Sequence, residues 1–304
     1  MVIISASRRT DIPAFHSEWF MGRVREGYVM VRNPVAHDVV YRIDLRPQNV
    51  DCLSFITKDP RPMERYIDEL MRSYDLLFQV TITPYGKDIE PNVPDVDVII
   101  DSFIRISKMI GKGHMLWRYD SVIIDDEHDI VYHMNSFKHI SDRLKGYTSR
   151  CIFSFLSMYD RIAHLEGMRP VPSNERVSFV KAVKDIAIDN GMELTSCCVE
   201  PELKELGVMN RGCIDRRLLI EQNIPFDDGM SNNRDGCLCV RNIDIGTYDT
   251  CMHDCIYCYA NSPNRIKRSS KGYDVDSESL CDVLKDGDRI VDIGKNMNCR
   301  LSDF

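Results

Sequence analysis

Three cysteines, Cys251, Cys255 and Cys258, stand within eight residues of one another. Cysteine thiolates are ligands for soft metals and for iron–sulfur clusters, and a spacing of three and then two intervening residues places them on one short loop. Three thiolates can hold three irons of a cubane [4Fe–4S] cluster, and the fourth iron then has no protein ligand. The spacing therefore predicts a [4Fe–4S] cluster with one iron open to chemistry.

Other interpretations fit this triplet less well. Structural zinc sites usually take four ligands as two paired hooks, whereas here three cysteines crowd into eight residues. A disulfide framework is typical of secreted proteins, and the first residues of the sequence show no basic segment followed by a long apolar one. Twelve cysteines without such a segment indicate metal or redox chemistry in the cytoplasm. A group of buried, reduced thiols is the remaining alternative.

A second group of cysteines lies between residues 197 and 239. We expect four thiolates from this group, with either Cys197 or Cys198 as the first of them; the expected ligands are Cys198, Cys213, Cys237 and Cys239. Four protein ligands complete the coordination of a cluster, which suits an auxiliary iron–sulfur cluster for electron transfer or structure better than catalysis. The alternatives are a four-thiolate zinc site and reduced cysteines that pack as small apolar residues.

Charged side chains follow several of the apolar runs that we expect to be strands. In βα folds the loops after the strands build the active site. The candidate catalytic residues in such positions are Arg8, Arg9, Asp11, Arg118 and Asp120. Arginine binds a carboxylate or phosphate through two parallel hydrogen bonds, so the paired arginines favour an anionic substrate. The alternative is that each charge belongs to a capping or ion-pair network.

The elements that must position these residues alternate along the first 195 positions. Apolar runs typical of strands cover residues 2–5, 28–31, 50–57, 76–83, 114–119, 151–156 and 193–196. Apolar residues at helical spacing cover residues 11–27, 63–74, 99–110, 137–144 and 180–190. A short helix over 216–222 is expected, with Asp215 as its N-cap. Cys52 and Cys151 fall within strand-like runs, and we expect them to pack in the core.

This alternation predicts an α/β fold, a full or partial (β/α) barrel of mainly parallel strands with a C-terminal cysteine-rich segment. An open doubly wound sheet is the alternative. We expect residues 1–195 to form a barrel-like domain and residues 196–304 to form an iron–sulfur segment that completes the barrel. His253, inside the cysteine triplet, is expected to face solvent.

Composition excludes several classes of protein. The 304-residue sequence is 43% hydrophobic and 28% charged, which is ordinary for a folded domain. No apolar run is long enough to span a membrane, and the formal net charge of −8 gives no support to nucleic-acid binding, although a local basic patch is allowed. The sequence contains no glycine-rich dinucleotide motif and no P-loop.

The aromatic residue before the last cysteine of the triplet, Tyr257, completes a CxxxCxΦC pattern, and this pattern resembles that of the radical S-adenosylmethionine (SAM) superfamily. The resemblance implies that the open iron takes the amino and carboxylate groups of SAM and that one electron cleaves SAM to a 5′-deoxyadenosyl radical. It also implies that Tyr257 lies along the adenosine, with Tyr259 and Asn261 as further cofactor-binding residues.

Longer segments are similar to the family called domain of unknown function 1848. The similar segments are 4–13, 83–86, 117–120, 213–215, 244–248 and 251–261. This family is described as having a C-terminal cysteine cluster like the N-terminal one of radical SAM enzymes. In those enzymes the motif follows the first barrel strand, whereas here 46 residues follow Cys258. A permuted arrangement resolves the difference: residues 242–246 would form the motif-bearing strand and pair beside the strand at Val2.

Together these features predict a radical-SAM-like, oxygen-sensitive enzyme with one catalytic and one auxiliary [4Fe–4S] cluster. The expected partners are a small-molecule or nucleotide-like substrate and a reductant such as ferredoxin or flavodoxin. Two alternatives are an iron–sulfur or zinc scaffold that binds nucleic acid or protein, and an electron-transfer or redox-sensing module.

Overall fold

The computed structural model describes residues 2–159, 162, 168–197, 201–231, 236–262 and 272–293. Its main feature is a sheet of eight strands in the order β10-β1-β4-β5-β6-β7-β8-β9, and all pairs in it are parallel. The strands are β1 (Ile3–Ala6), β4 (Cys52–Thr57), β5 (Asp75–Thr81), β6 (Met115–Val122), β7 (Arg150–Phe155), β8 (Glu193–Ser196), β9 (Met209–Asn210) and β10 (Ile243–Asp244).

The strand order decides between the two predicted architectures. From β1 to β9 the strands of the sheet follow one another in sequence order, as in a (β/α) barrel, and the order does not reverse as it does in a doubly wound sheet. The edge strands β9 and β10 do not pair with each other among the described residues. The fold is therefore a partial barrel, and the full barrel that the sequence also allowed does not form.

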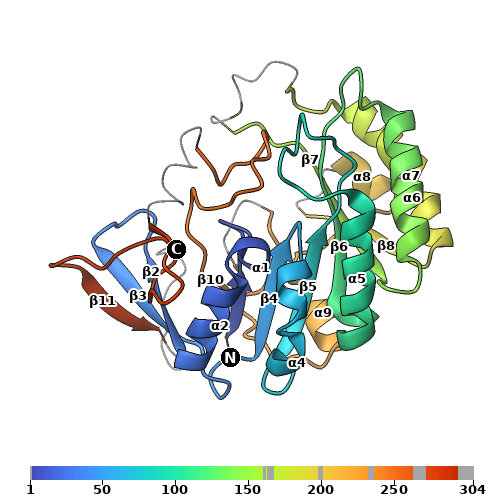
Figure 1. The fold of residues 1–304 in the computed structure, drawn as a ribbon. Coiled ribbons are helices and arrows are strands. Elements are labelled where there is room, and N and C mark those ends of the chain that lie inside the picture. Colours follow the sequence, from blue (N-terminus) through green and yellow to red (C-terminus); the bar gives the residue numbers. More distant parts are fainter. Residues whose placement is uncertain are drawn as a thin grey trace.

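Helices cover the outer face of the sheet (Figure 1). The longest are α5 (Val96–Ile110), α6 (Ile130–Leu144) and α7 (Ser173–Asp189), and the shorter ones are α1 (Ile12–Phe15), α2 (Ser17–Glu26), α3 (Arg61–Glu64), α4 (Ile67–Leu70), α8 (Pro201–Glu205) and α9 (Arg216–Glu221). Aromatic residues of the strands, such as Phe78 and Trp117, join Phe103, Phe137 and Phe179 of the long helices in one buried core. This outer core anchors the sheet.

The inner face of the sheet is divided into an apolar end and a polar end. Near the start of the strands, five residues pack against Leu218 and Leu219 of α9 in a separate apolar cluster; these are Ile3, Cys52, Leu77, Leu116 and Ile152. Side chains two positions apart in a strand share a face. Two positions farther along each of these five strands, the side chain on the same face is polar; these residues are Ser5, Ser54, Gln79, Arg118 and Ser154. Helix α9 thus closes the bottom of the partial barrel, and the polar layer faces the carboxyl ends of the strands.

The permuted strand predicted for residues 242–246 is confirmed. Strand β10 pairs in parallel with β1, with Ile243 opposite Ile4 and Asp244 opposite Ser5. The cysteine triplet follows β10 after a short loop, so it begins at the same edge of the sheet as the loops that follow the other strands. The sequence places the motif late in the chain, but the fold places it beside the first strand.

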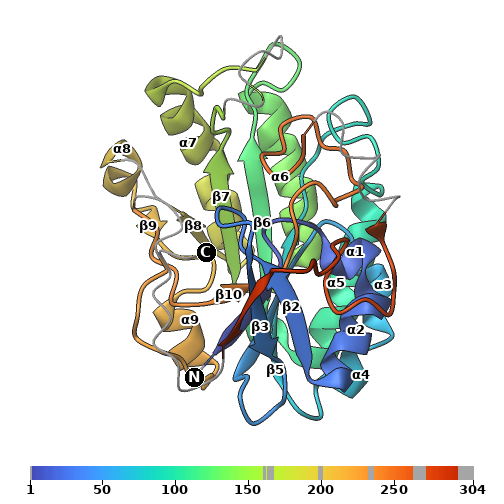
Figure 2. The ribbon, with the colours of Figure 1, turned by 90° about the vertical axis from the view of Figure 1, so that its left-hand side faces the viewer.

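A second, three-stranded sheet was not predicted. It contains β2 (Tyr28–Arg32), β3 (Val39–Asp44) and β11 (Arg289–Ile293) in the order β11-β3-β2, and Figure 2 shows β11 beside β3. The expected strand at 28–31 forms, but it belongs to this sheet. The Arg32 guanidinium binds the carboxylates of Asp282 and Asp288 at 2.6 and 2.7 Å, which fastens the C-terminal segment to the β2–β3 hairpin.

Two of the predicted helices are each divided in two. Residues 11–27 form α1 and α2, which meet at His16, and Gly27 ends α2 in a left-handed conformation with φ of 80°. Residues 63–74 contribute to α3 and α4 instead of one continuous helix. The predicted helix after Asp215 forms, and the Asp215 carboxylate accepts a hydrogen bond from the Leu218 amide. No helix among the described residues is long and apolar enough to cross a membrane.

Candidate functional site

A cavity of about 620 Å³ opens at the carboxyl ends of the strands. Both groups of cysteines line it: Cys251, Cys255 and Cys258 from the triplet, and Cys197, Cys213, Cys237 and Cys239 from the second group. The five predicted catalytic residues line it too, as do Tyr257 and Tyr259. The fold thus brings together residues that lie more than 200 positions apart in the sequence.

The loop of the cysteine triplet is held by its own side chains. Asn261, predicted to bind the cofactor, donates from Nδ2 to the carbonyl oxygen of Cys251 at 3.0 Å. The Ala260 amide donates to Cys258 Sγ at 3.4 Å. Asn261 is not part of the cavity wall, so in this structure it closes the loop behind the cysteines. Its Oδ1 atom is buried and has no hydrogen-bond partner among the described residues.

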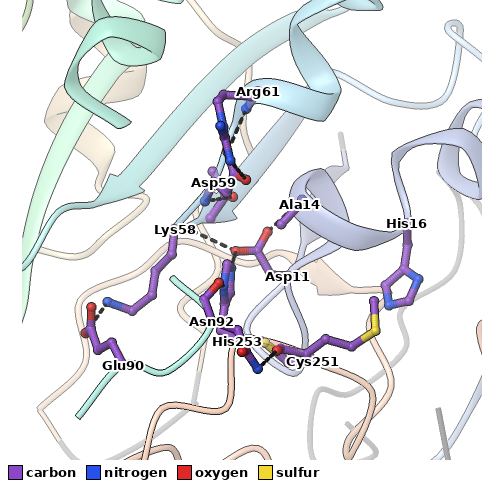
Figure 3. Close-up of polar contacts among 12 residues, drawn as sticks. Asp11, Ala14, His16, Lys58, Asp59, Arg61, Glu90, Asn92, Cys251 and His253 are labelled. Carbon is purple, nitrogen blue, oxygen red and sulfur yellow. Dashed lines mark hydrogen bonds and ion pairs between the residues drawn. The ribbon is translucent and has the colours of Figure 1, made fainter. Parts of the chain in front are cut away.

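A buried carboxylate after β1 fixes the first half of the loop (Figure 3). Asp11 Oδ2 accepts hydrogen bonds from His253 Nε2 at 2.8 Å and from the Lys58 amide at 2.7 Å, and its Oδ1 accepts from the Ala14 amide at the start of α1. The expectation that His253 faces solvent is wrong, because its ring packs on Phe15 with centroids 4.6 Å apart and is 3% exposed. Asp11 therefore positions the loop.

A second buried carboxylate, after β5, fixes the other half of the loop. Glu90 Oε1 accepts hydrogen bonds from Lys58 Nζ at 2.7 Å, from Thr83 Oγ1 at 2.8 Å and from the hydroxyl group of Tyr257. The side chains of Lys58 and Glu90 are only 13% and 2% exposed, and Figure 3 shows the Lys58 ammonium group directed at Glu90. Tyr257 therefore presents its ring to the cavity with its hydroxyl group already bound.

Burial favours the protonated thiols of two cysteines of the triplet in the absence of metal. It raises the pKa of Cys251 to about 12 and also raises the pKa of Cys255, against the opposing effect of the nearby Lys58 ammonium group. Metal binding requires thiolates, so loading this loop releases protons.

The second group of cysteines forms a compact buried cluster of its own. Its members are Cys197, Cys213, Cys237 and Cys239, so Cys197 takes the place predicted for Cys198, which lies outside the described residues. Hydrogen bonds from Cys197 and Cys239, helped by the Arg118 guanidinium, lower the pKa of Cys213. Arg118 Nη1 lies 2.8 Å from Cys213 Sγ. This site, unlike the triplet, favours a thiolate without metal.

Close backbone packing builds the second group. A Cβ atom added at Gly212 would lie 2.7 Å from the amide nitrogen of Cys239 and from the carbonyl carbon and oxygen of Leu238. Only a glycine at position 212 lets this part of the chain approach the backbone of the segment from Cys237 to Cys239 so closely. Asp215, two residues after Cys213, caps α9 and binds Arg150 at 2.7 Å, which ties this loop to β7.

The two predicted arginines after β1 share one carboxylate. Asp244 Oδ2 accepts from the Arg8 amide at 2.7 Å and from Arg8 Nε at 3.2 Å, while Arg9 Nε lies 3.9 Å from Asp244 Oδ1. Ser7 Oγ and the Gly246 amide also donate to Asp244 Oδ1, at 2.8 and 2.9 Å. Asp244 lies on β10, so this network joins the permuted strand to the first strand.

A second ion pair lies on the floor of the cavity. Arg118 binds Asp120 through Nη2, and its Nη1 also donates to Gln79 Oε1 at 3.2 Å. Asp120 in turn accepts a hydrogen bond from the hydroxyl group of Ser154. Arg118 therefore connects the polar layer of the barrel to Cys213. The predicted roles of Arg118 and Asp120 in catalysis stay predictions, while their place in the lining of the cavity and the contact of Arg118 with Cys213 are shown.

Three residues that complete these networks were not among the predicted site residues: Lys58, Glu90 and Asp244. Lys58 stands in a polar turn after a predicted strand, and Asp244 in the strand predicted to carry the triplet, so position along a strand could have pointed to both. Glu90 lies seven residues beyond Thr83, and nothing in the local pattern distinguishes it from other acidic residues. Its role depends on a turn that brings it back under the triplet.

The donor atoms fit an iron–sulfur cluster chemically. Seven sulfur atoms line one cavity, and thiolate is the ligand that iron–sulfur clusters and structural zinc share. Two buried cations, Lys58 and Arg118, lie beside the triplet and the second group respectively. No group of three or more His, Cys, Asp or Glu side chains in the described part of the chain is arranged to hold a single metal ion.

Comparison with models of protein families identifies the family of this chain. The model of the family described as domain of unknown function (DUF1848) matches residues 3–260, a range that includes the main sheet and both groups of cysteines. No curated protein and no solved structure matches the chain.

Proposed function

The chain belongs to the family described as domain of unknown function (DUF1848), and we propose that it is a radical-SAM-like iron–sulfur enzyme. In this proposal Cys251, Cys255 and Cys258 hold a [4Fe–4S] cluster with one open iron. The second group, with Cys197 in place of Cys198, holds an auxiliary cluster. When bound, the first cluster would supply the electron that cleaves SAM reductively, and a ferredoxin or flavodoxin would deliver that electron.

One observation supports this proposal above the others: a permuted strand brings the triplet to the active-site end of a partial (β/α) barrel. Strand β10 pairs with β1, and the cysteines that follow it share one cavity with the loops after the strands. In such barrels the loops after the strands carry the chemistry. A metal used only as scaffolding does not need a cavity of about 620 Å³ beside its ligands.

The residues around the cavity have separate tasks in this account. Asp11 and Glu90 hold the triplet loop through His253 and Tyr257, and so position the segment that carries the cysteines beside the cavity. The side chains of Tyr257 and Tyr259 lie in the wall beside the triplet, where they would contact the bound SAM. Arg118 and Asp120, which line the same cavity, would orient the substrate.

Metal analysis and electron paramagnetic resonance (EPR) test this proposal. The protein is reconstituted with iron and sulfide without oxygen, and its iron, sulfide and zinc are counted before and after reduction. We expect about eight irons per chain, on the basis of two four-iron clusters, about four in the Cys255→Ala variant, and a change in the EPR spectrum of the reduced protein on addition of SAM. A spectrum that SAM leaves unchanged, with iron bound, would favour a scaffold or an electron-transfer module instead.

A further inference from the structure

One wall of the cavity, where β1 meets β10, differs from the rest of its lining. Ser5 and Asp244 are opposite each other in the two strands, and Ser7 and Asn242 lie just beyond the strand ends, two positions away along the chain. All four residues line the cavity. Arg8, in the loop after β1, lies over this wall and is held there by Asp244.

The end of the Arg8 side chain is free to bind a ligand. Its Nε and its backbone amide are bound to Asp244, whereas Nη1 and Nη2 have no hydrogen-bond partner among the residues that the structure describes. The side chain is 29% exposed and lines the cavity. Arg9 differs, because its Nη1 contacts the carbonyl oxygen of Gly246 at 3.5 Å and its guanidinium lies over the Tyr248 ring.

The cations around the cavity differ in how they are paired. Lys58 is paired with Glu90, and Arg118 is paired with Asp120. Arg8 and Arg9, by contrast, share the single carboxylate of Asp244. Asp244 is buried and already accepts four hydrogen bonds from Ser7, Arg8 and Gly246. Two guanidinium groups at this wall therefore face one carboxylate, whose hydrogen-bonding capacity is already used.

Two polar atoms in the same wall have no hydrogen-bond partner among the described residues. They are Ser5 Oγ and Asn242 Oδ1, and their residues are 0% and 2% exposed. Buried polar groups are rarely left without a partner in a folded protein, so each of these atoms needs an explanation such as a bound ion or water or a role in chemistry. The wall therefore has a free guanidinium fork and unsatisfied polar groups in or beside adjacent strands.

We propose that Arg8 binds a carboxylate or phosphate group of the substrate through Nη1 and Nη2. The fork of a guanidinium matches both anions with two parallel hydrogen bonds, and Asp244 holds Nε so that the fork is already oriented. The Tyr259 hydroxyl group, which donates to the Arg8 carbonyl oxygen at 2.6 Å, connects this position to the triplet loop. The inference rests on the proposed function, which makes this cavity the substrate site.

Isothermal titration of the metal-free protein with malonate and with inorganic phosphate, at constant ionic strength, tests the inference. We expect binding of at least one of these anions to wild-type protein and a loss of at least about tenfold in Arg8→Gln, because a charge-assisted pair of hydrogen bonds is removed. Arg8→Lys keeps the charge but loses the fork, so it should bind more weakly than wild type and more tightly than Arg8→Gln.

The matched control is Arg61→Gln. Arg61 is paired with Asp59 through two nitrogens outside the cavity wall, and its replacement should leave anion binding unchanged. Equal binding by wild type and Arg8→Lys, or by wild type and a folded Arg8→Gln, would overturn the assignment. So would an absence of binding to wild type.

A second arm separates a substrate anion from the carboxylate of SAM. The dissociation constant of SAM is measured from the EPR change of the reconstituted protein, and we expect it to differ by less than about twofold between wild type and Arg8→Lys. A tenfold weakening would assign Arg8 to SAM and overturn its assignment to the substrate. Failure of the proposed function itself would appear differently, as missing iron or an unresponsive spectrum in the wild type, while anion binding is measured without metal.

Discussion

The buried pair of Lys58 and Glu90 allows a quantitative test of how the triplet loop is held. Three variants are compared with wild type: Lys58→Met, Glu90→Gln and the double variant that carries both. Each single substitution leaves one charge buried without its partner, because the two side chains are 13% and 2% exposed. In the double variant both charges are gone, and Thr83 and Tyr257 can still donate to the amide oxygen of the glutamine.

The expected magnitudes follow from this burial. Removing one partner of a buried ion pair costs about 3–5 kcal/mol, so each single variant should lose about that much unfolding free energy. The double variant should lose about as much as one single variant, not twice as much. The coupling energy from the double-mutant cycle then equals the loss in one single variant, about 3–5 kcal/mol.

Urea unfolding of the metal-free protein, followed by tryptophan fluorescence, measures these values. Both tryptophans of the chain, Trp19 and Trp117, are fully buried, so unfolding exposes both. The matched control is the exposed pair of Arg25 and Glu69, 57% and 43% exposed and 2.7 Å apart, for which a coupling of about 0.2–1 kcal/mol is expected. A coupling for Lys58 and Glu90 no larger than that of this control would refute the reasoning.

Two further predictions concern other parts of the molecule. Burial lowers the pKa of His133 to about 4, so folding favours the neutral ring. The unfolding free energy of the wild type should therefore fall by about 3 kcal/mol as the pH falls from 6.5 to 4. Urea unfolding measured across this pH range should show that this contribution to the fall is missing in His133→Gln. Gly212→Ala places a Cβ atom 2.7 Å from the backbone of the Cys237–Cys239 hook, so it should lose the second metal site while the triplet still binds iron. Gly22→Ala, whose nearest contact would be 3.8 Å away, should keep full iron content; equal iron in both variants would contradict this account.

The architecture was largely readable from the sequence because its elements have strong local patterns. The runs at 76–83 and 151–156 are apolar and β-branched or aromatic, and both form central strands, β5 and β7. The permuted strand at 242–246 was predicted from the position of the triplet, and its pairing with β1 is confirmed. Cys52 and Cys151 pack in the core as expected. Strand β3 was missed although it pairs with the neighbouring β2 in a hairpin. The pairing of β11 with β3 could not be predicted from local patterns, because it joins segments about 250 residues apart.

The details of the site depend on contacts between distant segments, and local patterns do not record them. His253 looks like an exposed loop residue in the sequence, but Asp11 and Phe15 bury it. Arg8 and Arg9 look equivalent, but the structure gives them one shared carboxylate and leaves only Arg8 with a free guanidinium fork among the described residues. From residue types and their positions in the sequence we could predict many of the residues that line the cavity. Their partners could be assigned only with the fold.

Formation of 5′-deoxyadenosine is the measurement that tests the central claim most directly. Reconstituted protein is incubated anaerobically with SAM and dithionite, and the products are separated by liquid chromatography and mass spectrometry. The account predicts 5′-deoxyadenosine and methionine from wild-type protein and neither product from Cys258→Ala, which lacks one of the three ligands of the open cluster. An iron-loaded wild-type protein that binds SAM but yields neither product, or equal yields from both proteins, would contradict it.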